Sequence, residues 1–174
     1  MDSCRDAMPL RMVLGAVLAW IVTGVSVILW GVPPLSLVGL FSATVVVEYA
    51  AAAVGIGLGL TPIFLLVFIT AFALGVICSL FALFDALATS SGRVCRFLEH
   101  VREKHGQSRL LRKYGILSLV PLVIIIGFYF TPPLAWFMGW DRRWTLILLG
   151  IGEALGIVLT LALTLGILRI FGIG

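Results

Sequence analysis

Residues 37–60 of the chain read Leu-Val-Gly-Leu-Phe-Ser-Ala-Thr-Val-Val-Val-Glu-Tyr-Ala-Ala-Ala-Ala-Val-Gly-Ile-Gly-Leu-Gly-Leu. The run is long enough to cross a membrane, because about 20 apolar residues span a hydrocarbon core of roughly 30 Å. Glu48 is its only charged residue. A charged side chain at bilayer depth costs about 2.5–3.5 kcal/mol on insertion scales, so such a residue is kept only where it is paired, protonated or beside a wet cavity. The stretch therefore predicts a membrane fold and places a candidate functional residue inside it.

The composition extends this prediction to the whole chain. Of its 174 residues, 61% are hydrophobic and 11% are charged, with a mean hydropathy of +1.20, whereas soluble domains carry about 25% charged residues. We expect an all-α integral membrane protein with a single transmembrane domain over residues 1–174. Residues 12–32 are longer than the apolar core of a signal peptide and lack its cleavage pattern, so we interpret them as a retained first span.

Five apolar stretches of membrane-crossing length follow one another: Met12–Val32, Leu35–Leu60, Ile63–Phe84, Tyr114–Met138 and Trp144–Leu168. If all five crossed, the basic pair at 142–143 would lie opposite the basic loop at 85–113, although Lys and Arg favour the cytoplasmic side. Three full spans plus two opposed re-entrant helical hairpins, at 35–60 and 114–138, remove this conflict. A plain five-span helical bundle with proline kinks is the alternative.

The composition of the two hairpin stretches favours the same arrangement. The first is rich in small residues between Ala50 and Gly59, which let backbones approach closely. The second contains the helix breakers Pro121, Gly127, Pro132 and Pro133. Broken helices at membrane depth persist only where they are buried in protein or face a cavity.

The loop at 85–113 carries seven of the twelve basic residues: Arg93, Arg96, Arg102, Lys104, Arg109, Arg112 and Lys113. The positive-inside rule predicts that this loop is cytoplasmic. Val94, Phe97, Leu98 and Val101 recur at helical spacing, which indicates an amphipathic helix in the headgroup plane or a solvated helix packed on the bundle. We expect anionic lipid headgroups, and no nucleic acid, as the partner of these basic residues.

Two acids lie deep in apolar stretches. Gly152 and Ala154 flank Glu153, and a run of alanines begins at Ala50, two positions after Glu48, so other helices can come near both acids. Intramembrane acids commonly mark ion or proton pathways, and two neighbouring carboxylates in a low dielectric disfavour double ionisation. We predict that both bind substrate or protons. The alternative is that they are protonated and hydrogen-bond neighbouring helices, whereas Asp85, at the end of the third stretch, is expected to be interfacial.

No motif predicts an enzyme, a metal site or a cofactor. The sequence has no Gly-x-Ser-x-Gly, Walker or His-Glu-x-x-His motif, and the glycines at 55–59 lack the strand that a dinucleotide fingerprint needs. His100 and His105 have no Cys or acid at ligand spacing, and three scattered cysteines argue against a disulfide framework.

The order of these features over about residues 40–168 resembles the small multidrug export proteins, a family distantly similar to the DedA-type membrane fold. The resemblance rests on Val47-Glu48 ahead of glycines that alternate to Gly59, on Lys113-Tyr114-Gly115 after the charged loop, and on Gly139-Trp140-Asp141-Arg142-Arg143 before the last helix. The family's Arg-Gly and Pro after its Glu are replaced here by Tyr49 and alanines, and Gly127 alone stays in register with its second hairpin. The resemblance implies paired re-entrant hairpins, a role in export and a prokaryotic plasma membrane.

These observations predict a small membrane transporter or exporter of an amphipathic or lipid-like substrate, coupled to protons through an intramembrane carboxylate. The alternative function is a non-transporting scaffold or lipid-organising protein that acts through its basic loop. A homodimer is compatible with the small size, because two copies can complete a cavity that one cannot.

Overall fold

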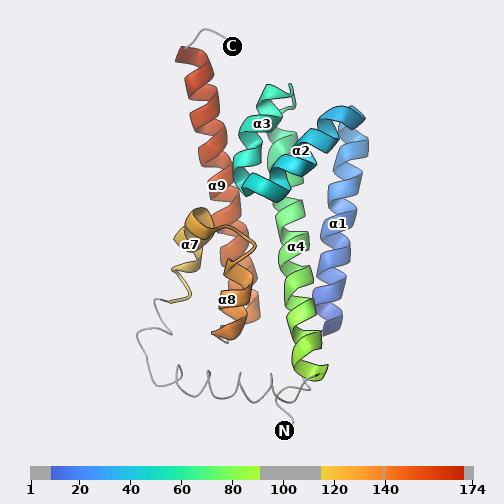
Figure 1. The fold of residues 1–174 in the computed structure, drawn as a ribbon, viewed down its shortest axis with the longest axis vertical. Coiled ribbons are helices and arrows are strands. Elements are labelled where there is room, and N and C mark those ends of the chain that lie inside the picture. Colours follow the sequence, from blue (N-terminus) through green and yellow to red (C-terminus); the bar gives the residue numbers. More distant parts are fainter. Residues whose placement is uncertain (1–8, 91–114, 139, 171–174) are drawn as a thin grey trace.

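The computed structural model describes residues 9–90, 115–138 and 140–170, and every regular element in these ranges is a helix (Figure 1). Three helices run the length of the molecule: α1 (Pro9–Trp30), α4 (Pro62–Ser90) and α9 (Arg142–Ile170). The predicted all-α class is thus confirmed for this part of the chain. Most of the basic loop, with its predicted amphipathic helix, lies outside the described residues.

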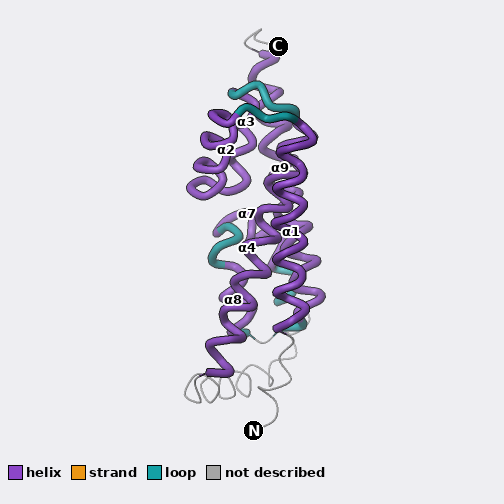
Figure 2. Tube along the Cα trace, turned by 90° about the vertical axis from the view of Figure 1, so that its right-hand side faces the viewer, coloured by secondary structure: helices purple, strands orange, loops and turns teal. Residues whose placement is uncertain are grey.

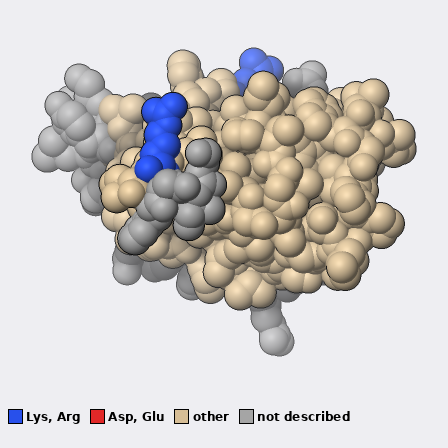
Figure 3. Space-filling model, turned by 90° about the horizontal axis from the view of Figure 1, so that it is seen from above, with Lys and Arg blue, Asp and Glu red and all other residues tan. Residues whose placement is uncertain are grey.

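Four helical segments are long and apolar enough to cross a membrane: Met12–Trp30, Pro34–Gly57, Pro62–Ala88 and Arg142–Ile167. Large apolar side chains cover much of the outer surface. Figure 3 shows little Lys or Arg, and no Asp or Glu, among the described residues of the face seen from above. These properties are those of an integral membrane protein, as the composition predicts.

The second of these segments is bent back on itself. Helix α2 (Pro34–Val47) has a proline in its first turn, and a single 3-10 turn, η1 (Glu48–Ala50), joins it to α3 (Ala51–Gly57). Figures 1 and 2 show α2 and α3 together in the upper half of the molecule. We call residues 34–57 the first hairpin; its tip is at Glu48.

A second hairpin, residues 119–137, occupies the lower half in the same views and consists of α7 (Leu119–Ile126) and α8 (Thr131–Phe137). Its helix breaks at Gly127, whose φ of 93° and ψ of 172° suit a residue without a Cβ. The prolines do not break it: Pro121 lies in the first turn of α7, and residues 132–133 lie in the first turn of α8. A first turn tolerates proline because its N–H groups have no intrahelical partner.

The core consists of two groups of buried apolar side chains, one for each hairpin. The first group packs the first hairpin on α4 and α9 and contains Leu40, Ala51, Ala52, Phe64, Leu65, Phe68, Ile69, Ile157 and Leu161. The second group packs the second hairpin on the same two helices and contains Met12, Phe72, Ala73, Ile77, Phe81, Ala88, Leu119, Val123, Phe128, Ala135, Trp136 and Leu149. The long helices therefore support both hairpins and bring their tips together.

Candidate functional site

The tip of the first hairpin is a residue in an unfavourable backbone conformation. Glu48 has φ 56° and ψ −129°, and it is the only non-glycine residue with positive φ in the described ranges. Such a conformation costs on the order of 1–3 kcal/mol and persists where the surrounding structure imposes it. The Glu48 N–H donates to the Thr44 carbonyl oxygen and closes the last turn of α2, while the side chain leaves the helix toward the second hairpin.

The carboxyl group of Glu48 contacts the backbone at the tip of the second hairpin, at Gly127 and Phe128. Its Oε2 accepts a hydrogen bond from the Phe128 backbone N–H at 3.0 Å. A Cβ on Gly127 would lie only 1.9 Å from the same oxygen. The contact therefore requires both the break at Gly127 and the absence of a side chain there.

Two glycines of α9 leave room for both hairpins to pack closely against this helix. A Cβ on Gly152 would lie 3.0 Å from the Val120 carbonyl oxygen of α7, and a Cβ on Gly156 would lie 3.1 Å from Cγ of Tyr49. The Tyr49 hydroxyl donates to the Ile124 carbonyl oxygen of α7. This spacing of two small residues by four positions is a known way of bringing membrane helices close, and here it joins the hairpins to each other and to α9.

Glu153 lies between these glycines and is fully buried, with 0% exposure. Neither of its carboxyl oxygens has a hydrogen-bond partner among the described residues. An ionised carboxylate without a partner is very costly in an apolar environment. The alternative prediction, that this acid serves as polar glue, requires a hydrogen bond to a neighbouring helix, and the described part of the chain supplies none.

The two predicted acids belong to one group of ionisable side chains. Glu48 and Glu153 lie within electrostatic range of each other and of Tyr49 and Tyr129. We call these four residues the tip cluster. Sequence reasoning found its acids but missed its tyrosines and the Gly127–Tyr129 backbone, for which the only signal was a glycine between two apolar runs.

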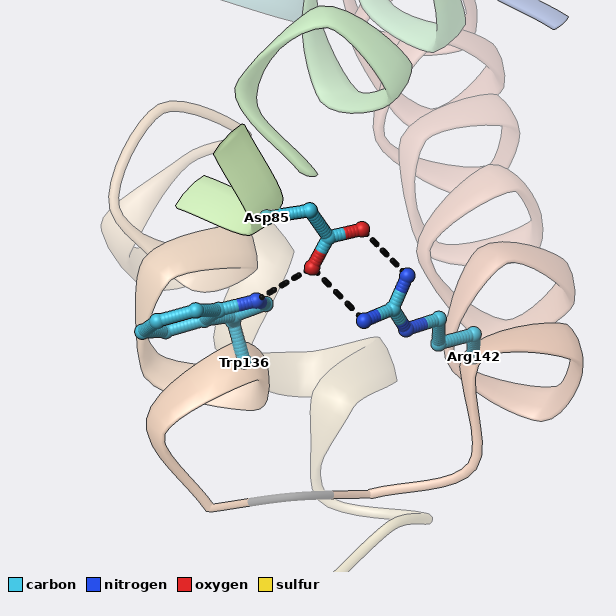
Figure 4. Close-up of polar contacts among 3 residues, drawn as sticks. All are labelled: Asp85, Trp136 and Arg142. Carbon is cyan, nitrogen blue, oxygen red and sulfur yellow. Dashed lines mark hydrogen bonds and ion pairs between the residues drawn. The ribbon is translucent and has the colours of Figure 1, made fainter. Parts of the chain in front are cut away.

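A second polar group ties the second hairpin to α4 and α9 (Figure 4). Asp85 of α4 is only 2% exposed. Its Oδ1 accepts hydrogen bonds from Trp136 Nε1 at 2.9 Å and from Arg142 Nη2 at 2.6 Å, and its Oδ2 accepts from Arg142 Nη1. This ion pair is the only one among the described residues. Asp85 is thus buried in the protein and paired, and its expected depth at the membrane interface stays a prediction. An acid and a basic residue at the same predicted end of two spans were the available signal for the pair.

The remaining predicted site residues are not placed. Arg93, Arg96, Arg102, Lys104, Arg109, Arg112 and Lys113, the predicted lipid-headgroup site, all lie outside the described residues. Within the described ranges, no group of three or more His, Cys, Asp or Glu side chains is arranged to hold a metal ion.

Two apolar grooves lie on the surface of the described helices. One, of about 390 Å³, lies between α1, α2 and α4 and is lined by residues that include Trp20, Leu37 and Phe41. The other, of about 340 Å³, lies along the second hairpin, where Ile126 and Phe130 flank the tip. Both are suited to hydrocarbon, because nearly all of their lining atoms are apolar.

Comparisons of the chain with family models, with characterised proteins and with solved structures gave no match. The features that bear on function are the two hairpin tips, the tip cluster and the grooves.

Proposed function

We propose that the chain is a small membrane transporter or exporter of an amphipathic or lipid-like substrate, coupled to proton movement through Glu48 and Glu153. The observation that carries this proposal is the contact between the two broken helices, where the carboxyl group of Glu48 at one tip accepts a hydrogen bond from the Phe128 backbone amide of the other. Discontinuous helices that meet near the midplane are a common plan for transporter binding sites.

In this proposal α1, α4 and α9 cross the membrane and the two hairpins enter it from opposite faces. Helices of 22, 29 and 29 residues are about 33–44 Å long at 1.5 Å per residue, enough for a core of roughly 30 Å. The hairpin arms have 14, 7, 8 and 7 residues and reach about 10–21 Å. An arm of that length ends inside the bilayer and supports a chain that returns to the face it entered.

Protonation of Glu48 supplies a link between proton binding and movement. A hydrogen bond to an ionised group contributes about 1.5–3 kcal/mol, whereas a neutral one contributes about 0.5–1.5 kcal/mol. Neutralising the carboxylate therefore weakens its bond from the Phe128 amide and loosens the contact between the tips. Glu153 supports this role, because two neighbouring carboxylates in a low dielectric favour the binding of at least one proton.

The grooves and the order of sequence features support the substrate class. Apolar grooves of some 340–390 Å³ suit the hydrocarbon part of an amphipathic molecule, and the grooves offer almost no polar partner for a hydrophilic solute. The order of sequence features over about residues 40–168 is also the basis on which we propose that the chain is a divergent member of the small multidrug export proteins.

The test is flux in proteoliposomes with a panel of fluorescent cationic, anionic and neutral amphiphiles under an imposed pH gradient. Glu48→Gln keeps the size of the side chain and removes its titration, so it should abolish pH-driven movement of any amphiphile that the unmodified chain carries. Glu153→Gln should reduce the pH dependence as well. Unchanged flux in Glu48→Gln would disprove the proposal.

The alternative function, a scaffold that acts through the basic loop, depends on residues 93–113, which lie outside the described part of the chain. It predicts the opposite ranking of variants. Charge reversal across Arg93–Lys113 should then abolish membrane organisation, measured as clustering of anionic lipid, while Glu48→Gln leaves it intact.

A further inference from the structure

We propose that Asp85, Trp136 and Arg142 form a latch, and that opening of this latch withdraws the second hairpin's tip from Glu48. The inference rests on the proposed function for its purpose, since it identifies the part that moves during transport. The contacts that support it are those of Asp85 with Trp136 and Arg142, drawn in Figure 4.

The latch joins three elements at one buried carboxylate. Asp85 comes from the last turns of α4, Trp136 from α8 and Arg142 from the first turn of α9. Both oxygens of Asp85 are used, and one of them accepts from both partners. Loss of this carboxylate therefore removes the polar contacts of both α8 and α9 with α4, and leaves a partly buried guanidinium without its counter-charge.

The position of Arg142 is explained by the latch and not by its own helix. A positive charge in the first turn of a helix opposes the helix dipole. The capping of α9 is supplied by Asp141, whose Oδ1 accepts from the backbone N–H groups of Arg143 at 2.9 Å and Trp144 at 3.2 Å. Arg142 adds nothing to that cap, and its guanidinium turns to Asp85 in α4.

A continuous path of contacts leads from the latch to the tip. Trp136 is 6% exposed and packs on Phe84 of α4, with ring centroids 5.3 Å apart. Five residues earlier in the same short helix, the buried Thr131 donates its hydroxyl to the Gly127 carbonyl oxygen at 2.6 Å. Helix α8 and the tip are thus bound to each other, so that a shift of α8 away from α4 also moves the Phe128 amide that bonds to Glu48.

The latch is also accessible enough to open. The Arg142 side chain is 27% exposed, whereas that of Asp85 is 2% exposed. Water can therefore replace the arginine's bonds from one side without prior unfolding of the core. Ring contacts of Phe84 with Trp136 and Phe137 also join α4 to α8. Such apolar contacts are non-directional, which permits sliding.

The experiment measures how fast a polar maleimide labels single cysteines in proteoliposomes, with Cys4, Cys78 and Cys95 replaced. Ala135→Cys reports on α8 and Val123→Cys reports on α7 next to the tip; the unmodified residues are 1% and 0% exposed. Ala52→Cys, at a 0% exposed position of the first hairpin, is the matched control. Each is combined with Asp85→Asn, or with Trp136→Phe, which removes only the indole N–H and retains an aromatic ring.

The expected result is that Asp85→Asn raises labelling at both Ala135→Cys and Val123→Cys by about tenfold or more, because it breaks a buried charge pair. Trp136→Phe should raise both by a smaller factor, and Ala52→Cys should stay at its original rate. Adding Arg142→Gln to Asp85→Asn should open the hairpin no further, since the pair is already broken.

Three outcomes would overturn the latch. They are unchanged labelling in both Asp85→Asn and Trp136→Phe, an equal rise at Ala52→Cys (a general loosening), or a rise at Ala135→Cys alone (a fraying of α8 without the tip). No substrate is needed, so the result is independent of the flux assay. A failure of Glu48→Gln to alter flux would remove the proposed function and leave the labelling result standing.

Discussion

Replacing Gly127 by alanine should separate the two hairpin tips. The new Cβ would lie 1.9 Å from Glu48 Oε2 and 2.3 Å from its carboxyl carbon, at a φ of 93°. The backbone conformation costs about 1–3 kcal/mol for a residue with a Cβ, and loss of the charge-assisted bond from Phe128 costs about 1.5–3 kcal/mol more. We therefore expect Gly127→Ala to lower the free energy of unfolding by about 2.5–6 kcal/mol.

Thermal unfolding in detergent measures this loss. Cys78 is buried, with 7% exposure, so with Cys4 and Cys95 replaced its reaction with a thiol-reactive dye reports unfolding. The expected decrease in Tm is about 5–24 °C, taking 2–4 °C for each kcal/mol in a chain of this size. Gly57→Ala is the matched control, because a Cβ there would meet nothing within 4 Å. That variant should keep or slightly raise the Tm, since alanine favours helix over glycine.

A double variant decides whether the loss arises from the contact with Glu48. In Glu48→Ala/Gly127→Ala the carboxyl group that clashes is gone, so the double variant should be about 1–3 kcal/mol more stable than the sum of the two single effects predicts. Effects that add to within about 0.5 kcal/mol would show that the two residues are independent. That result would refute the assignment of the two tips as one site.

Three further variants test the packing around the site. Gly55→Ala should lower stability by about 1–3 kcal/mol in the same thermal assay, because its Cβ would lie 2.2 Å from Cδ2 of the fully buried Leu65, which has no room to move. Tyr49→Phe should cost about 0.5–1.5 kcal/mol through the lost bond to the Ile124 carbonyl oxygen; no change in Tm would mean that this bond contributes nothing. Glu153→Met should raise stability by about 1–3 kcal/mol while reducing the pH dependence of flux, because it removes a buried, unpartnered carboxyl group; a lower Tm would contradict this.

The positions of the broken segments could be predicted from sequence because their causes are local. Small residues and a lone acid around Glu48, and a glycine between two apolar runs at Gly127, disturb a membrane helix whatever surrounds them. Which residue ends the helix was harder to predict from the sequence. Proline is a strong helix breaker in a helix interior but not in a first turn, and the sequence alone does not show where a first turn will fall. For that reason Gly127, and not the prolines, terminates α7.

The contacts across the site could not be predicted, because they depend on how the segments are arranged in space. The bond from Phe128 to Glu48 joins residues 80 positions apart, and a backbone N–H carries no mark in the sequence. Asp85 and Arg142 were visible as charges, yet the burial of Asp85 follows from the packing of Trp136 beside it. Hydropathy predicts how deep a residue lies in the membrane. Its hydrogen-bond and ion-pair partners depend instead on which helices lie beside it.

The apolar lining of the two grooves determines how binding to this chain has to be measured. A molecule that occupies them exchanges with the surrounding lipid or detergent and not with bulk water. Its effective concentration is then a mole fraction in that oily phase, so adding empty micelles dilutes it even at constant volume. Titrations should therefore be plotted against ligand-to-lipid ratio, and curves collected at different lipid contents should coincide on that axis.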